Sequence, residues 1–168
     1  MRLLATGGIC VGLTIAGCTG QGNDVAGPTE EPSPSEAPIS AEDAALDAYD
    51  SMWEVVVEAS HEGEPDPPEL ELHATGDALA LMRQTLSGAA EDDASVQGEP
   101  VLSPEVIEAS SETVVLQDCM DSTGWVEHTE DDDVGDSPSG LREVDATVTF
   151  DGLSWMVAEL RIWESGSC

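Results

Sequence analysis

Residues 142–163 read REVDATVTFDGLSWMVAELRIW, and this stretch decides the fold class. Its first half alternates between apolar and polar residues, with Val144, Ala146, Val148 and Phe150 on one face and Asp145, Thr147 and Thr149 on the other. A period of two predicts a strand with one buried face over 142–150. The Asp151-Gly152 pair predicts a two-residue hairpin turn, after which 153–163 returns as an antiparallel strand.

Further strands are predicted upstream of this hairpin. Residues 101–109 indicate a strand in which Pro104 marks a sheet edge or a bulge, because proline donates no hydrogen bond to a neighbouring strand. Residues 113–120 predict the next strand, which 125–129 extends after an Asp-Ser-Thr-Gly interruption. Residues 130–140 are predicted to form a loop.

The residues before the strands have helical patterns. Ser40 is a predicted N-cap with Asp43 three residues later, and an apolar stripe follows at helical spacing: Ala45, Ala48, Tyr49, Met52, Val56 and Ala59. This stripe predicts a helix over 41–60. The opposite face of the helix carries acids, namely Asp47, Asp50, Glu54 and Glu58.

Shorter helical segments follow. Residues 68–74 indicate a short helix, and 77–87 a longer one that Gly88 would end, with a polar connection over 89–95. Helices followed by antiparallel strands predict an α+β domain, with N-terminal helices packed on one face of a curved antiparallel sheet.

The first 18 residues have the features of a lipoprotein export signal. Arg2 precedes an uncharged stretch that is too short to span a bilayer, and Ile15-Ala16-Gly17-Cys18 has the form of a lipobox. We therefore expect residues 1–17 to be a signal peptide and Cys18 to carry lipid. That lipid would anchor the protein to the cell membrane on its extracytoplasmic face, and an ordinary secretory signal is the alternative.

Residues 18–39 are predicted to be a disordered tether. They contain Pro28, Pro32, Pro34 and Pro38 among small and polar residues, and their apolar content is too low for a packed structure. The folded domain is accordingly expected over 40–168.

The charge balance excludes some functions. The chain has 36 acids, four arginines and a net charge of −32. Nucleic-acid binding is excluded because phosphate recognition needs clustered cations, and electrostatic adhesion to anionic lipid is excluded for the same reason. High solubility is the simplest interpretation of this acidity, with capture of a cationic ligand as the alternative.

Two cysteines remain in the exported domain. Cys10 lies in the predicted signal peptide and Cys18 would carry the lipid, which leaves Cys119 and Cys168. An even pair in an oxidising compartment predicts a disulfide, with two free thiols as the alternative.

Several short motifs resemble a known family. They are Gly76-Asp77-Ala78-Leu79, the run Gly98-Glu99-Pro100-Val101-Leu102-Ser103-Pro104, Asp118-Cys119-Met120-Asp121 with Trp125, and the terminal Gly166-Ser167-Cys168. With them, residues 41–168 resemble small secreted lipoproteins of high-GC Gram-positive bacteria with an NTF2-like (SnoaL-like) cone-shaped domain. The resemblance implies that Cys119 pairs with Cys168 and that the sheet is cone-like, and it implies no assigned reaction.

One cluster could carry chemistry. Asp118, Asp121 and Trp125 could line the concave side of such a sheet, where a buried carboxylate acts as a base, with Tyr49 as a donor and Arg142 as a cationic partner. The alternative is structural: both acids would hold the turn at the strand end, and Trp125 would pack in the core.

An acidic segment could hold a hard cation such as calcium through Asp131, Asp132, Asp133 and Asp136. The spacing does not match an EF-hand loop, so a solvated loop is the preferred interpretation. No metal or cofactor is therefore expected.

Together these features favour a non-enzymatic, lipid-anchored envelope protein that binds a small apolar ligand or an envelope partner. The alternatives are an isomerase- or hydrolase-type enzyme with a pocket carboxylate, and a cation-binding accessory protein.

Overall fold

A computed structural model describes residues 39–91, 94–128 and 140–168. Its elements in chain order are helix α1 (Ala41–Glu62), the 3-10 helix η1 (Pro68–Leu72), helix α2 (Gly76–Glu91), and strands β1 (Ser95–Gln97), β2 (Pro104–Ala109), β3 (Thr113–Asp121), β4 (Val126–His128), β5 (Leu141–Phe150) and β6 (Trp155–Ile162). The predicted α+β class is correct. In the described residues no helix is long and apolar enough to cross a membrane.

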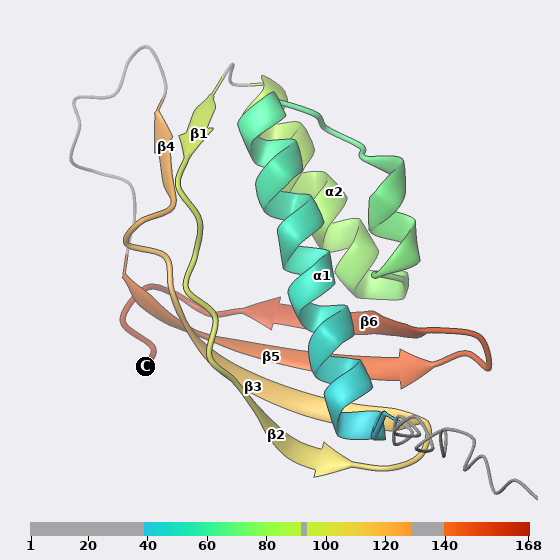
Figure 1. Cartoon of the computed structure of the whole chain (residues 1–168). Coiled ribbons are helices and arrows are strands. Elements are labelled where there is room, and N and C mark those ends of the chain that lie inside the picture. Colours follow the sequence, from blue (N-terminus) through green and yellow to red (C-terminus); the bar gives the residue numbers. More distant parts are fainter. Residues whose placement is uncertain (1–38, 92–93, 129–139) are drawn as a thin grey trace, which may run out of the picture. The chain divides into compact units, whose positions relative to one another are not determined.

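Two helices cover one face of a curved sheet (Figure 1). The main sheet is antiparallel throughout, in the order β2-β3-β5-β6, and β1 pairs with β4 in a separate two-stranded sheet. The strand predicted over 125–129 therefore does not extend β3, because β4 pairs with β1 instead. Strand β1 itself was not predicted.

Helix α1 begins as the sequence predicted and ends two residues later than predicted. The Ser40 hydroxyl accepts a hydrogen bond from the backbone amide of Asp43 at 3.1 Å and donates one to the Asp43 carboxylate at 2.7 Å. Gly63 ends the helix in the left-handed conformation, with φ of 67°, which glycine adopts without steric cost.

The predicted stop of the second long helix at Gly88 is wrong. Helix α2 continues through Gly88 to Glu91, and Gly88 is not among the glycines with positive φ. Ala89 and Ala90 are strong helix formers and are partly buried. Their high helix propensity offsets part of the cost of about 1 kcal/mol that a glycine imposes inside a helix.

The β5–β6 connection also differs from the prediction. It has four residues, because the Asp151 carboxylate accepts hydrogen bonds from the amides of Leu153 at 2.8 Å and Ser154 at 2.9 Å. This aspartate-stabilised loop replaces the predicted two-residue turn. Leu153 is 91% exposed and lies outside the strand.

At the other edge of the sheet, Pro104 is the first residue of edge strand β2. The edge position is correct, and the irregularity of this strand falls between Val106 and Glu108, not at Pro104. Strand β2 therefore begins three residues after the predicted start at 101. Val101 makes only an isolated bridge to Asp121.

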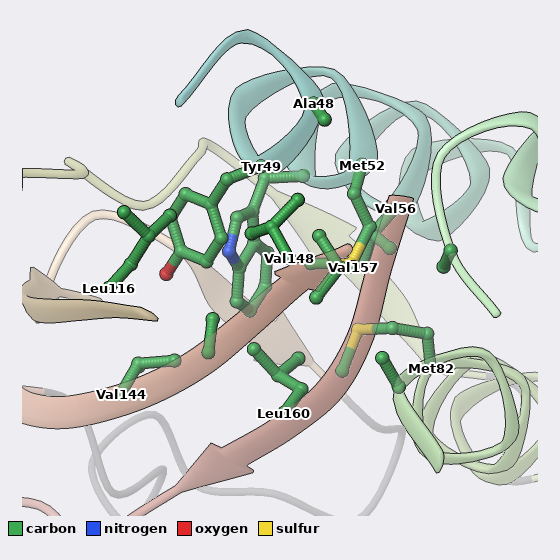
Figure 2. Close-up of a cluster of buried hydrophobic side chains, with 14 of the residues drawn as sticks. Ala48, Tyr49, Met52, Val56, Met82, Leu116, Val144, Val148, Val157 and Leu160 are labelled. Carbon is green, nitrogen blue, oxygen red and sulfur yellow. The ribbon is translucent and has the colours of Figure 1, made fainter. Parts of the chain in front are cut away.

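The core lies between the helices and the concave face of the sheet (Figure 2). Tyr49, Met52 and Val56 of α1 and Met82 of α2 pack against side chains of the sheet: Leu116, Val144, Val148, Val157 and Leu160. Val144, Ala146 and Val148 are buried as predicted. Phe150 is 37% exposed, because it lies at the end of β5 and packs against Trp155 with ring centroids 5.6 Å apart.

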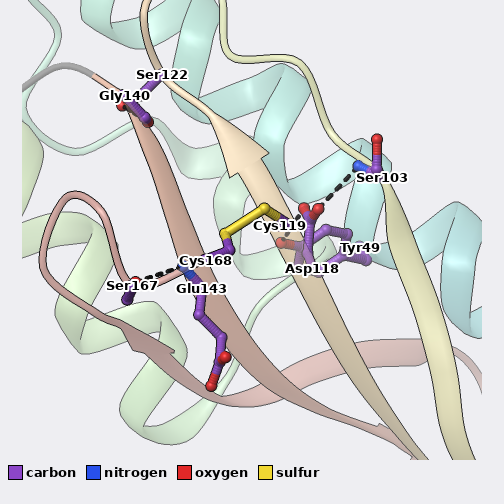
Figure 3. The surroundings of a disulfide bond; sticks show 9 residues. All are labelled: Tyr49, Ser103, Asp118, Cys119, Ser122, Gly140, Glu143, Ser167 and Cys168. Carbon is purple, nitrogen blue, oxygen red and sulfur yellow. Dashed lines mark hydrogen bonds between the residues drawn. A yellow bond between two sulfur atoms is a disulfide. The ribbon is translucent and has the colours of Figure 1, made fainter.

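The C-terminal residues cross the other face of the sheet. A disulfide joins Cys119 of β3 to Cys168, with Cα atoms 6.0 Å apart, and so pairs the two cysteines that the sequence predicted (Figure 3). Hydrogen bonds hold this segment over β5: the Gly166 amide donates to the Leu141 carbonyl at 2.7 Å, and the Glu143 amide to the Ser167 hydroxyl at 2.8 Å. The last six residues are thereby tied to two neighbouring strands.

Candidate binding groove and the buried carboxylate beside it

A hollow of about 670 Å³ runs along one side of α1. Its lining comes from α1 and from the segment 99–102 between β1 and β2: Asp50, Trp53, Glu54, Val57, Glu58, His61, Glu62, Glu99, Pro100 and Leu102. We call this hollow the acidic groove and the segment 99–102 its wall. Its volume falls in the range of small-molecule sites, roughly 300–1,000 Å³.

Carboxylates recur along the helical side of the acidic groove. Asp50, Glu54, Glu58 and Glu62 are four residues apart, so they lie on one face of α1 with a rise of roughly 6 Å between neighbours. Glu99 adds a fifth acid from the wall. The series is one of like charges, which destabilises a helix.

None of the arginines that the structure describes lines the acidic groove. Among the described arginines, Arg83 binds Asp66 at 2.5 Å and Glu71 at 2.6 Å, and Arg161 lies over the ring of Trp163 at 3.4 Å. These two arginines therefore do not neutralise the groove.

The base of the acidic groove is apolar and packed. Val57, Pro100 and Leu102 lie beside Trp53, which is 2% exposed. Trp53 contacts Tyr49 and Trp125 edge to face, with ring centroids 6.3 and 5.9 Å apart. This aromatic packing fixes the base against the core.

The surroundings of Asp50, which lines the groove, disfavour its negative charge. The pKa of Asp50 is raised, first by burial and then by the charges of Asp47 and Asp118. A cation bound there would counter both charge effects.

The wall is attached to the domain at several points. The Nε2 atom of His61 lies 2.6 Å from the Gly98 carbonyl oxygen, and Val101 and Asp121 exchange two backbone hydrogen bonds of 2.9 Å. Gly98 has φ of 74°, and a Cβ atom there would overlap the backbone carbonyl of Gly124. Only glycine fits this close approach.

Asp118 provides a further attachment (Figure 3). It is 1% exposed, and its two carboxylate oxygens accept hydrogen bonds from the Ser103 amide at 2.8 Å and from the Tyr49 hydroxyl at 3.0 Å. Burial raises the pKa of Asp118, and the two hydrogen bonds act in the opposite direction. The pKa of Tyr49 is raised as well, first by burial and then by the Asp118 charge, and the Trp53 indole opposes this shift.

The predicted cluster of Asp118, Asp121 and Trp125 is not brought together as one site. Asp118 faces the helices, as the enzyme alternative requires, but both of its oxygens are hydrogen-bonded and it does not line the acidic groove. Asp121 holds the turn after β3, where hydrogen bonds from the side chain and amide of Thr123 lower its pKa. Trp125 packs on Trp53, as the structural alternative expected.

The other candidate residues lie away from the acidic groove or outside the described residues. Arg142 lies opposite Met120 in the β3–β5 register, and the hydrogen bonds of Asp118 go to other residues. Cys18 and the acidic segment with Asp131, Asp132, Asp133 and Asp136 lie outside the described residues. Within the described ranges no three metal-ligating side chains come together.

The acidic groove was not predicted from the sequence. Asp50, Glu54 and Glu58 were correctly predicted on the face of the helix opposite its apolar stripe, but no local pattern indicated that a distant segment forms a second side. The available signal was the four-residue spacing of these acids without an interleaved basic residue.

No protein-family model and no curated protein sequence matches the chain. Its structure is similar to the crystal structure of a "putative aromatic ring hydroxylase" from Novosphingobium aromaticivorans, with a TM-score of 0.53 and 12% identity over 72% of this chain and 86% of that one. The intermembrane space region of the chloroplast protein ARC6 aligns with a TM-score of 0.49 and 11% identity, over 77% of this chain and all of that one. At such low identity the first likeness concerns the fold alone, and the domain has the NTF2-like α+β fold that the sequence predicted.

Proposed function

We propose that the protein is a lipid-anchored, extracytoplasmic binding module whose acidic groove takes a basic peptide segment of an envelope partner. One observation carries the proposal: five carboxylates line the hollow together with an apolar base, and none of the arginines in the described part of the chain lines it. A ligand that satisfies this lining needs both positive charge and apolar surface. Of the two ligands expected from the sequence, a small apolar molecule and an envelope partner, this lining favours the partner.

The carboxylate spacing suggests how the segment would lie. Neighbouring acids on α1 are roughly 6 Å apart along the helix. In an extended peptide, alternate residues are roughly 6.6 Å apart and point to the same side. An extended segment with Lys or Arg at every second position could therefore pair with successive acids, while the intervening residues face away.

Peptide titration tests this proposal. An alternating Lys-Ala peptide should bind more tightly than a peptide of the same composition with its lysines in one block, because only the first matches the acid spacing. Isothermal titration calorimetry at physiological ionic strength would measure both affinities. The Debye length is then roughly 8 Å, so charges farther apart than this are largely screened. Equal affinities would indicate attraction to the overall charge and would reject the groove as the site.

A matched pair of variants localises the binding. Glu54→Gln/Glu58→Gln removes two charges from the groove, and Glu105→Gln/Glu108→Gln removes two exposed charges from edge strand β2. The groove variant should lose about tenfold or more in affinity for the alternating peptide, and the β2 variant much less. Similar losses in both would contradict the proposal.

The anchor needs its own test. The lipobox Ile15-Ala16-Gly17-Cys18 supports lipidation at Cys18, and the resemblance to secreted lipoproteins supports it independently. We expect Cys18→Ala to move the protein from the membrane fraction to the medium or to leave the precursor unprocessed. A Cys10→Ala variant is the matched control and should remain with the membrane. A Cys18→Ala protein that is processed like the wild type and still stays in the membrane fraction would reject the anchor.

A further inference from the structure

We propose that Tyr49 and Asp118 are positioning residues that hold the wall of the acidic groove at its distance from α1. This inference rests on the proposed function, because it concerns the shape of the proposed binding groove. Tyr49 and Asp118 are buried and do not line the groove themselves.

A single carboxylate connects the two sides of the groove. One oxygen of Asp118 accepts from the Ser103 amide at 2.8 Å, and Ser103 follows Leu102 of the wall. The other accepts from the Tyr49 hydroxyl at 3.0 Å, and Tyr49 precedes Asp50 on the helical side. Figure 3 shows Asp118 on β3 between Tyr49 and Ser103.

The proline after the wall explains why a side-chain acceptor stands at this position. Pro104 lies opposite Asp118 in the β2–β3 register and has no amide hydrogen to donate to the sheet. The Ser103 amide is therefore the last donor before β2, at a part-buried position where an unsatisfied amide would be costly. Asp118 satisfies it and fixes where the wall joins the sheet.

The wall has other attachments that do not involve Asp118. Gly98, the residue just before the wall, is held by His61, and Val101 of the wall is held by its backbone pair with Asp121. Loss of the Asp118 bonds should therefore free the Leu102–Ser103 end of the wall and leave the Val101 end in place. This graded effect separates a positioning role from a general role in folding.

The test compares a substitution of Asp118 that keeps both hydrogen bonds with one that removes them. Asp118→Asn keeps an oxygen that can accept from the Ser103 amide and an amide group that can donate to the Tyr49 oxygen. Asp118→Leu keeps similar bulk and removes both bonds. Tyr49→Phe removes only the bond to the helix and is the milder variant should Asp118→Leu fail to fold.

Amide hydrogen exchange, followed by NMR, measures how well the backbone amides at the wall are protected. In Asp118→Leu the Ser103 amide should exchange about tenfold faster or more, since it loses its acceptor, while the Val101 amide stays protected as the internal control. In Asp118→Asn both amides should exchange as in the wild type. Unchanged Ser103 exchange in Asp118→Leu would overturn the proposal.

The alternating Lys-Ala peptide gives the second readout. We expect Asp118→Leu and Tyr49→Phe to bind it more weakly by about threefold to tenfold, and Asp118→Asn to bind it within about twofold of the wild type. If Asp118→Asn binds as weakly as Asp118→Leu, the charge of Asp118 matters rather than its hydrogen bonds, and the positioning role is wrong. If the wild type does not bind the peptide, the proposed function fails, and hydrogen exchange still decides the positioning role.

Discussion

Asp118 brings a carboxylate into the core, where two neutral groups, the Ser103 amide and the Tyr49 hydroxyl, donate hydrogen bonds to it. Burial disfavours its charged form, and the hydrogen bonds from Ser103 and Tyr49 only partly offset that cost, so its pKa is raised in the folded protein. An acid whose pKa is raised on folding binds protons more readily in the folded state. Its contribution to stability is therefore lost as the pH rises through the folded pKa.

We accordingly expect Asp118→Asn to be more stable than the wild type at pH 7, because the amide keeps the shape of the side chain without its charge. The difference should shrink as the pH falls through the raised pKa of Asp118, because the side chain then becomes protonated and neutral in the folded protein. Asp121 and Asp151 have lowered pKa values and lose stabilisation as the pH falls, but they do so in both proteins. Urea unfolding at several pH values measures the difference, and a wild type at least as stable as Asp118→Asn at pH 7 would contradict it.

At this scale the sequence identified residue types but not their partners. Asp118 and Tyr49 were both singled out as candidates, yet they are 69 residues apart in the chain, and no local pattern specifies that they meet. Ser103 was not a candidate at all, because its backbone amide, not its side chain, makes the contact with Asp118. Contacts that depend on tertiary packing are not encoded in spacing.

At the scale of elements, the strongest periodic segments were predicted well. The stripe of α1 and the alternation of β5 each reflect burial of one face, and this pattern determines the type of element. The errors fall where two local effects compete. Gly88 does not end α2, because the alanines that follow it favour the helix. The predicted two-residue turn at Asp151-Gly152 does not form, because hydrogen bonds to the Asp151 carboxylate stabilise a four-residue loop instead.

Repulsion between the acids that line the groove should destabilise helix α1. Replacing Glu58 by Lys turns two repulsive four-residue pairs, with Glu54 and Glu62, into attractive ones. At roughly 0.2–0.5 kcal/mol for each pair in either sense, the variant should be more stable by about 1 kcal/mol. The same change should weaken binding of the alternating Lys-Ala peptide.

Urea unfolding and calorimetric titration measure the two effects of Glu58→Lys. Glu105→Lys makes the same change in net charge on the exposed side of β2 and controls for the general reduction of negative charge. If Glu105→Lys stabilises the protein as much as Glu58→Lys, the overall charge and not the helix series causes the effect. If Glu58→Lys is less stable than the wild type, the repulsion along α1 is not a significant cost.

For the whole molecule, the order of helices before strands was enough to predict the α+β class, and the resemblance to a known family implied the NTF2-like fold. The placement of β1 against β4 was not predictable, because three-residue strands leave no measurable period. The acidic groove depends on that placement, since its wall is the connection from β1 to β2. The candidate site was therefore less predictable than the fold.

The disulfide acts on the molecule as a whole, because it closes a loop between residues 49 positions apart and ties the C-terminus across β5 to β3. In the chain-entropy model a loop of this length restricts the unfolded state by about 4 kcal/mol. The double variant Cys119→Ser/Cys168→Ser should be less stable by about that amount in urea. Reductant should destabilise the wild type similarly and leave the double variant unchanged. A loss below about 1 kcal/mol would mean that the hydrogen bonds of Gly166 and Ser167 already hold the C-terminal segment, and that the disulfide adds little to the stability of the domain.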